Sequence, residues 1–164
     1  MPTAFYRHFT SMEELGITLV DESMRSLRAM MRAARSEPGA SADVIRASVR
    51  TLYEHVRQQE DHFWFLTRER YGGSGPVQHA IRTELRLFSS DLAVDLARFE
   101  GFRRWSTEDL HMMADLIVTA MLSTVLELLE ARPRDRATDE RIVRTAEDRL
   151  RLVMLAVPHW RSKH

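Results

Sequence analysis

Apolar residues recur at three- and four-residue spacing along most of the chain, and this periodicity restricts the possible folds more than any other feature. The longest such stripe runs from Val77 through Leu85 and Leu92 to Phe99. This spacing puts side chains on one face of an α-helix, whereas a half-buried strand needs alternate residues. β-branched residues are scattered and do not alternate. We therefore predict an all-α fold, a bundle of amphipathic helices.

Glycine and proline mark the ends of the predicted helices. The clearest breaks are Pro38-Gly39, the run from Gly72 to Gly75, and Pro133, because these residues favour turns and interrupt helices. Ser106 is positioned to cap the helix that follows it. The predicted helices span residues 12–35, 41–58, 60–71, 76–101, 106–129 and 138–159.

The first long helix has two different sides. Its predicted core side carries the apolar residues Met12, Leu19, Leu27, Met30 and Ala34. The opposite side carries Arg25, Arg28, Arg32 and Arg35. A basic stripe can bind DNA or an anionic ligand, but no aromatic side chain interleaves with this one, and charge runs usually face water. We therefore expect these arginines to form a solvated face.

Length and charge exclude several classes of protein. A chain of 164 residues is one domain that can bury a sizeable core. Its formal net charge is zero, whereas an autonomous nucleic-acid-binding domain usually carries a basic face. The absence of cysteine excludes disulfides and thiolate metal sites and fits a reducing compartment. We predict a cytoplasmic protein.

The most apolar segment, residues 110–129, is long enough to cross a bilayer. It contains His111, Asp115 and Glu127, each of which is costly at membrane depth. We therefore predict a buried helix of a soluble protein and no membrane partner. Because apolar residues surround its axis, this helix should meet both its own core and a second subunit.

The N-terminal segment predicts a very short helix, a turn and the start of a long helix. It reads Pro2-Thr3-Ala4-Phe5-Tyr6-Arg7-His8-Phe9-Thr10-Ser11-Met12-Glu13-Glu14-Leu15. Pro2 suits a first helical turn, and Ser11 with Glu14 forms a capping box. The string resembles the end of the helix-turn-helix in TetR-family transcriptional repressors. The resemblance is greatest to the FabR/DesT-like branch, which regulates unsaturated fatty-acid synthesis, and it extends through Val20-Asp21-Glu22-Ser23.

This resemblance implies two parts: residues 1–11 as the end of a helix-turn-helix with a remnant of the recognition helix, and residues 12–164 as the ligand-binding and dimerisation domain. It implies that Thr3, Ala4, Tyr6 and His8 face operator DNA. A helix-turn-helix also needs a first helix that crosses the DNA backbone, and none precedes the remnant in this chain. Met12 also replaces a lysine that meets phosphate in many relatives. We therefore expect operator binding only where the complete motif is present; otherwise these side chains only decorate the N-terminus.

The resemblance also implies a ligand pocket between the middle helices. The candidate lining residues are Leu52, Val56, Phe63, Leu66, Phe88, Leu92, Met113, Ile117 and Met121. By pattern alone, the same residues could form a packed core. The family favours a pocket, and flexible methionines suit an adaptable apolar ligand. The nearest branch implies a long-chain acyl group, such as an acyl thioester (acyl-CoA). For its head group, the sequence offers only Arg68 and Arg70 as candidates.

The last two long helices are expected to pair with their symmetry mates in a four-helix interface, giving a homodimer. The candidate interface residues are Leu122, Leu126, Leu129, Val143, Leu150 and Val157. Such a dimer would place two recognition helices on two DNA half-sites.

No set of residues points to catalysis, and no cofactor is expected. His55 with His62, and His111 with Asp115, do not supply the three or more converging ligands that a metal site needs. The predicted function is therefore a TetR-like regulator, a repressor of lipid metabolism that senses an apolar ligand. The alternative is a stand-alone helical dimer that binds an apolar ligand or a partner protein and never touches DNA, which the neutral charge favours.

Overall fold

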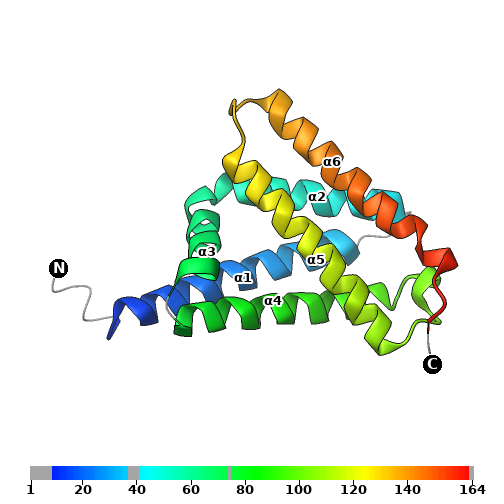
Figure 1. Ribbon diagram of the computed structural model, residues 1–164, viewed down its shortest axis with the longest axis horizontal. Coiled ribbons are helices and arrows are strands. Elements are labelled where there is room, and N and C mark those ends of the chain that lie inside the picture. Colours follow the sequence, from blue (N-terminus) through cyan, green and yellow to red (C-terminus); the bar gives the residue numbers. More distant parts are fainter. Residues whose placement is uncertain (1–8, 37–40, 74, 163–164) are drawn as a thin grey trace.

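The computed structural model describes residues 9–36, 41–73 and 75–162, and every regular element in these ranges is helical (Figure 1). The predicted all-α fold is confirmed. The elements are α1 (Met12–Ser36), α2 (Ser41–Gln58), α3 (Glu60–Gly72), α4 (Gly75–Leu96), η2 (Glu100–Phe102), α5 (Thr107–Glu130), α6 (Arg136–Leu155) and η3 (Val157–His159).

The helix boundaries agree with the predicted ones except at two C-terminal ends. The helix predicted over 76–101 ends at Leu96, where the short helix η2 takes over after Phe99. The last helix ends at Leu155 rather than at His159. Pro158 explains the second difference, because it has no N–H to donate to the carbonyl of Met154.

Polar side chains cap the start of three of the described helices, α1, α5 and α6; at α6 the Asp135 carboxylate accepts a hydrogen bond from the Thr138 N–H at 2.7 Å. The Ser106 hydroxyl accepts a hydrogen bond from the Asp109 N–H at 3.2 Å, as predicted. The Ser11 hydroxyl accepts one from the Glu14 N–H at 3.1 Å. The Glu14 carboxylate accepts from the Thr10 N–H at 2.6 Å rather than from Ser11, so the predicted capping box is present in a shifted form. The hydrogen bonds from Thr10 hold the pKa of Glu14 below its usual value.

The helices form two crossing sets. Figure 1 shows α1 and α4 side by side along the long axis, with α5 crossing them diagonally and α3 standing across one end. Helix α1 packs on α4 and α2, while α5 packs on α4 and α6. The largest core cluster joins side chains from all six helices, including the fully buried Val20, Val56 and Leu128. The predicted apolar stripe of α4 faces the core, with Val77 and Leu92 buried and Leu85 packed against the core clusters.

The predicted buried face of α1 is wrong. Its buried residues are Gly16, Val20, Met24, Leu27 and Met31. Of the predicted apolar residues only Leu27 is buried, and Met12 is exposed; Gly16, a small residue that shares the predicted side, is buried. The reason lies in the packing of α1 against α4. A Cβ added at Gly16 would lie 3.2 Å from Val77 Cγ2, so the glycine allows the two helices to approach closely at this point.

Helix α5 is partly a core helix. Among the described residues, α5 is the one helix whose length and apolar composition would allow it to cross a membrane. Its inner side is buried, with Ala114, Val125 and Leu128 packed among the other helices. Its outer side leaves Met112 and Leu116 about half exposed.

Candidate functional site

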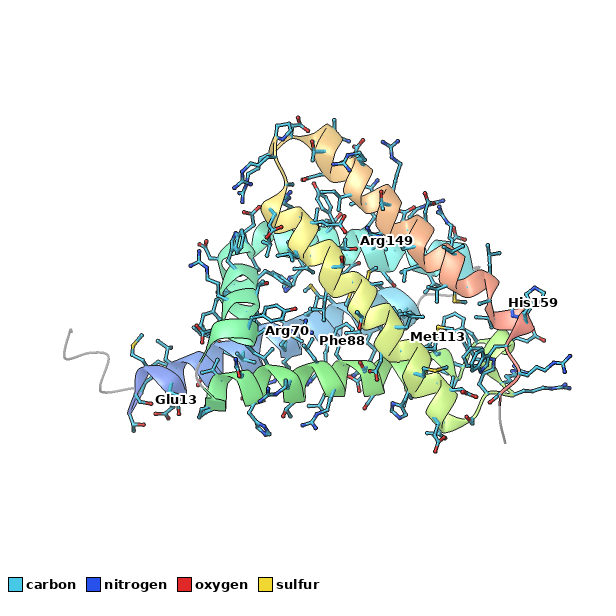
Figure 2. All side chains as sticks on the ribbon, in the orientation of Figure 1. Glu13, Arg70, Phe88, Met113, Arg149 and His159 are labelled. Atoms are coloured by element: carbon cyan, nitrogen blue, oxygen red, sulfur yellow. The ribbon has the colours of Figure 1, made fainter. Side chains whose placement is uncertain are left out.

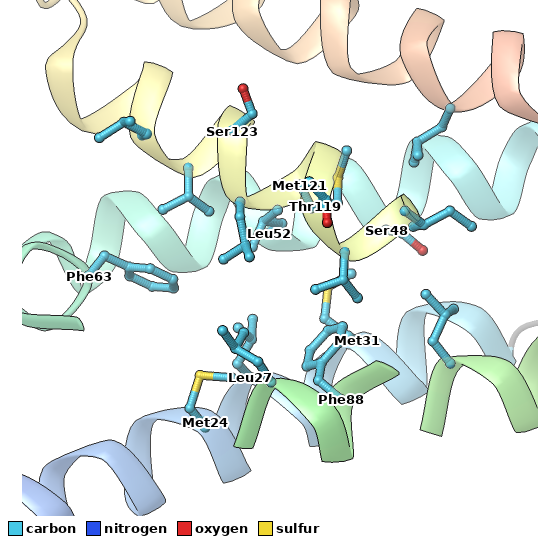
Figure 3. A pocket seen from close by; sticks show the side chains of 18 of the residues that line it. Met24, Leu27, Met31, Ser48, Leu52, Phe63, Phe88, Thr119, Met121 and Ser123 are labelled. Carbon is cyan, nitrogen blue, oxygen red and sulfur yellow. The ribbon is translucent and has the colours of Figure 1, made fainter. Parts of the chain in front are cut away.

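An apolar cavity of about 410 Å³ lies between the helices, within the usual size range of small-molecule sites. Its lining comes from α1 to α5, with a contribution from α6. Figure 3 shows Leu27 and Met31 of α1, Leu52 of α2, Phe88 of α4 and Met121 of α5 around this space. The middle of the molecule therefore contains a site that can take an apolar molecule.

Seven of the nine predicted pocket residues line this cavity, namely Leu52, Phe63, Leu66, Phe88, Leu92, Ile117 and Met121. Val56 and Met113 do not. Val56 is fully buried in the core cluster, and Met113 packs in a second cluster with Phe102 and Val157. Both side chains are held by neighbouring helices away from the cavity.

The sequence-based prediction missed the wall that α1 contributes. Met24, Leu27 and Met31 form this wall, and the spacing of Met24 and Met31 around Leu27 was the signal for it. It was overlooked because the predicted core face of α1 was wrong. As a result, a molecule in the cavity would touch the helix that begins directly after Ser11.

The polar groups of the lining are few. Hydroxyls come from Ser48, Thr67, Tyr71, Thr119 and Ser123, and two guanidinium groups come from Arg35 and Arg70. Among the described residues that line the cavity there is no Asp or Glu. The lining is therefore apolar with a net positive character.

Arginines of α1 bind acidic residues of α4 in what we call the α1–α4 ion-pair seam: Arg28 with Glu84, Arg32 with Asp91, and Arg35 with Asp95. The expected solvated face is therefore wrong for Arg28 and Arg35, which are largely covered, whereas Arg32 is paired but remains exposed. The innermost pair is the best buried. Arg35 donates from Nε at 2.9 Å and from Nη2 at 2.7 Å to Asp95 Oδ2.

A polar network fixes α2 against α3 and α6. Asp139 accepts hydrogen bonds from the Tyr53 hydroxyl at 3.0 Å and from Arg57 Nε at 2.9 Å. Arg57 also donates to Glu60 at 2.6 Å, and Arg134 donates to Glu60 at 2.7 Å. Burial raises the pKa of Tyr53, and its hydrogen bond to Asp139 adds to the effect. Burial alone would raise the pKa of Glu60, but the hydrogen bonds from the two arginines outweigh it and lower that pKa.

Four of the six predicted dimer-interface residues lie inside the protomer. Leu129, Val143, Leu150 and Val157 are buried, and Leu122, Leu126 and Leu150 line the cavity. Because the protomer already covers Leu129, Val143, Leu150 and Val157, a partner subunit would not reach these four side chains. Leu122 and Leu126 are half-buried and stay predicted interface positions. The large apolar side chains that α5 and α6 expose are Met112, Leu116, Leu152 and Leu155.

The predicted DNA-facing residues Thr3, Ala4, Tyr6 and His8 lie outside the described residues. Among the residues that are described, no three His, Cys, Asp or Glu side chains gather in a group that could hold a metal ion.

His55 packs edge-on to Phe63 with 5.5 Å between ring centroids. Burial lowers its pKa, and repulsion from His62 lowers it further. His55 therefore acts as a neutral packing residue.

A comparison with known protein families matches most of the chain. The family described as "Tetracyclin repressor-like, C-terminal domain" matches residues 41–155, which include α2 to α6.

Proposed function

The chain belongs to the Tetracyclin repressor-like C-terminal domain family, and from this premise we propose that it is the sensing part of a cytoplasmic TetR-like transcriptional repressor that responds to an apolar small molecule. The family is regulatory and generally non-enzymatic, and its domains bind ligands and dimerise in general. The observation that carries the proposal is the apolar cavity, whose lining includes Met24, Leu27, Met31 and Arg35 of α1.

The ligand is a molecule with a long apolar chain. Side chains of Met24, Met31 and Met121 line the cavity, and unbranched thioethers adapt to a flexible chain better than rigid side chains do. The resemblance of residues 2–23 to regulators of unsaturated fatty-acid synthesis supports a long-chain acyl group, for example as an acyl thioester, and a role in lipid metabolism.

Helix α1 connects the cavity to the segment that resembles a recognition helix. The ion-pair seam, from Arg28 to Arg35, holds the C-terminal half of α1 on α4. The N-terminal half rests mainly on apolar contacts, such as that of Gly16 with Val77, and on one contact of 3.5 Å between Ser23 Oγ and His62 Nδ1. A ligand against Met24 and Leu27 would tilt this less constrained half. Such a switch works only if the ligand binds one arrangement better than the other.

A homodimer forms, in this proposal, through the exposed apolar side chains of α5 and α6. Leu152 and Leu155 lie on the same helix and are 70% and 69% exposed, and a contiguous exposed apolar patch marks an interaction surface. In sedimentation at micromolar concentration, Leu152→Glu should shift the protein to monomer. Leu87→Glu, at a 45% exposed position on α4, is the control and should leave the dimer intact.

Ligand binding can be tested with a neutral fluorescent probe, N-phenyl-1-naphthylamine, displaced by long-chain molecules. Ile117→Trp puts bulk into the cavity and should weaken probe binding at least tenfold. His111→Trp, on the exposed side of the same helix, should leave it unchanged. If the wild-type protein does not bind the probe, or if both variants bind like wild type, the cavity is not a ligand site.

DNA binding needs a chain that carries the complete helix-turn-helix. In that chain, Tyr6→Ala should weaken operator binding with little change in melting temperature. A folded protein that binds the apolar probe but never shifts operator DNA, at any ligand concentration, would instead be the stand-alone ligand-binding dimer.

A further inference from the structure

Arg70 gives the cavity a cation that no side chain of the described protein neutralises. We infer that it anchors an anionic head group, so that the ligand is an anionic amphiphile with a carboxylate or phosphate at one end of an apolar chain. This inference rests on the proposed function, which by itself requires only an apolar ligand.

Two guanidinium groups line the cavity, and only one of them is already paired. Arg35 makes two hydrogen bonds to Asp95, and both side chains are at least 90% buried. Arg70 forms no ion pair with the described residues; its recorded contact is with the ring of Tyr71, 5.3 Å from the guanidinium carbon to the ring centroid. Its N–H donors are thus available to a ligand.

The position of Arg70 suits a head group. It lies in the last turn of α3, with Thr67 one turn before it and Tyr71 next to it, and all three line the cavity. Tyr71 is 74% exposed, so this end of the cavity reaches solvent. In Figure 2, Arg70 and Phe88 lie in the space that α3, α4 and α5 enclose. A ligand can therefore keep its charged end at the solvent boundary while its chain passes inward toward Phe88.

The chemistry of the site selects an anion. A guanidinium group offers a planar fork of donors that matches a carboxylate or a phosphate, and a charge-assisted hydrogen bond is about twice as strong as a neutral one. No described carboxylate lines the cavity to repel or replace the ligand's charge. A neutral alcohol with the same chain would fill the apolar part equally well but would gain much less from Arg70.

Arg68 provides a matched control on the same helix. It is exposed, stacks over Trp64 at 5.7 Å and does not line the cavity. Removing it changes the charge of the protein as much as removing Arg70 does, but leaves the cavity lining unchanged.

The experiment compares dodecanoate with 1-dodecanol at pH 8 in displacement of N-phenyl-1-naphthylamine. Wild type and Arg68→Gln should bind the acid roughly tenfold more tightly than the alcohol, as one charge-assisted hydrogen bond allows. Arg70→Gln should reduce this ratio to about one while its affinity for the alcohol stays as in wild type. Arg70→Lys keeps the charge but loses the planar pair of N–H donors, so its ratio of acid to alcohol affinity should be intermediate. This variant replaces Arg70→Gln in the test if the glutamine variant does not fold.

The outcomes separate this inference from the proposed function. Binding of the alcohol and the acid with equal affinity by wild type, or an unchanged ratio in the Arg70 variants, would overturn the head-group assignment alone. Binding of neither would overturn the proposed function as well. Dodecanoyl-CoA distinguishes the source of the anion: tighter, Arg70-dependent binding of the thioester assigns a phosphate, and tighter, Arg70-dependent binding of dodecanoate assigns a carboxylate.

Discussion

Removing Asp95 should destabilise the fold much more than removing Asp91, although each pairs with an arginine of α1. The side chains of Arg35 and Asp95 are only 8% and 10% exposed, whereas those of Arg32 and Asp91 are 57% and 35% exposed. Asp95→Ala leaves a buried guanidinium without its carboxylate, which costs about 3–5 kcal/mol. Asp91→Ala removes the partly exposed pair with Arg32 and a longer contact of 3.9 Å with Arg28, which keeps its partner Glu84; such a loss is worth about 0–1 kcal/mol.

The assay is urea unfolding followed by far-ultraviolet circular dichroism, with all variants at the same protein concentration because dimerisation affects the apparent stability. The double variant Arg35→Met/Asp95→Leu should recover most of the loss, because it removes both charges and fills the space with apolar groups. If the free energies of unfolding of Asp95→Ala and Asp91→Ala differ by less than about 1 kcal/mol, the reasoning from burial is wrong.

Two further predictions concern acid stability and helix packing. The folded-state pKa of Glu60 is depressed by Arg57 and Arg134. Its contribution to stability is therefore present above its unfolded pKa of about 4.5 and is lost as the pH falls through the folded value. Glu60→Gln should flatten the acid limb of the melting temperature plotted against pH, and an unchanged slope would contradict this. Gly16→Leu should lower the melting temperature despite the better helix propensity of leucine, because a Cβ at this position lies 3.2 Å from Val77 Cγ2. Adding Val77→Ala should recover part of the loss. A gain in stability from Gly16→Leu alone would refute the close-packing argument.

The helices and most buried faces could be predicted because they depend on local spacing. The prediction for the buried face of α1 was wrong because Met30 and Met31 are neighbours in sequence, and only the packing of α1 against α4 and α2 decides which one is buried. The ion-pair seam could not be seen at all, since the partner of Arg28 is Glu84, 56 residues further on. Periodicity shows which face of a helix is apolar, but not which residues of another helix pack against that face.

The candidate site was harder to predict for a related reason. An apolar stripe reads the same whether its side chains fill a core or surround a cavity, and the difference depends on gaps between helices that no local pattern records. Helix α5 shows this limit for the dimer interface as well. Because apolar residues occur all around it, the sequence did not distinguish Leu122, which lines the cavity, from Leu116, which is exposed.

The most direct test of the account is a nuclear magnetic resonance titration of methionine methyl groups with dodecanoate. Met24 and Met31 of α1 and Met121 of α5 line the cavity, whereas Met112 lies on the exposed side of α5. The account predicts saturable shifts of the first three methyl signals and none for Met112. Unchanged signals from Met24 and Met31, at ligand concentrations that shift Met112, would show that the ligand binds outside the cavity and does not reach α1.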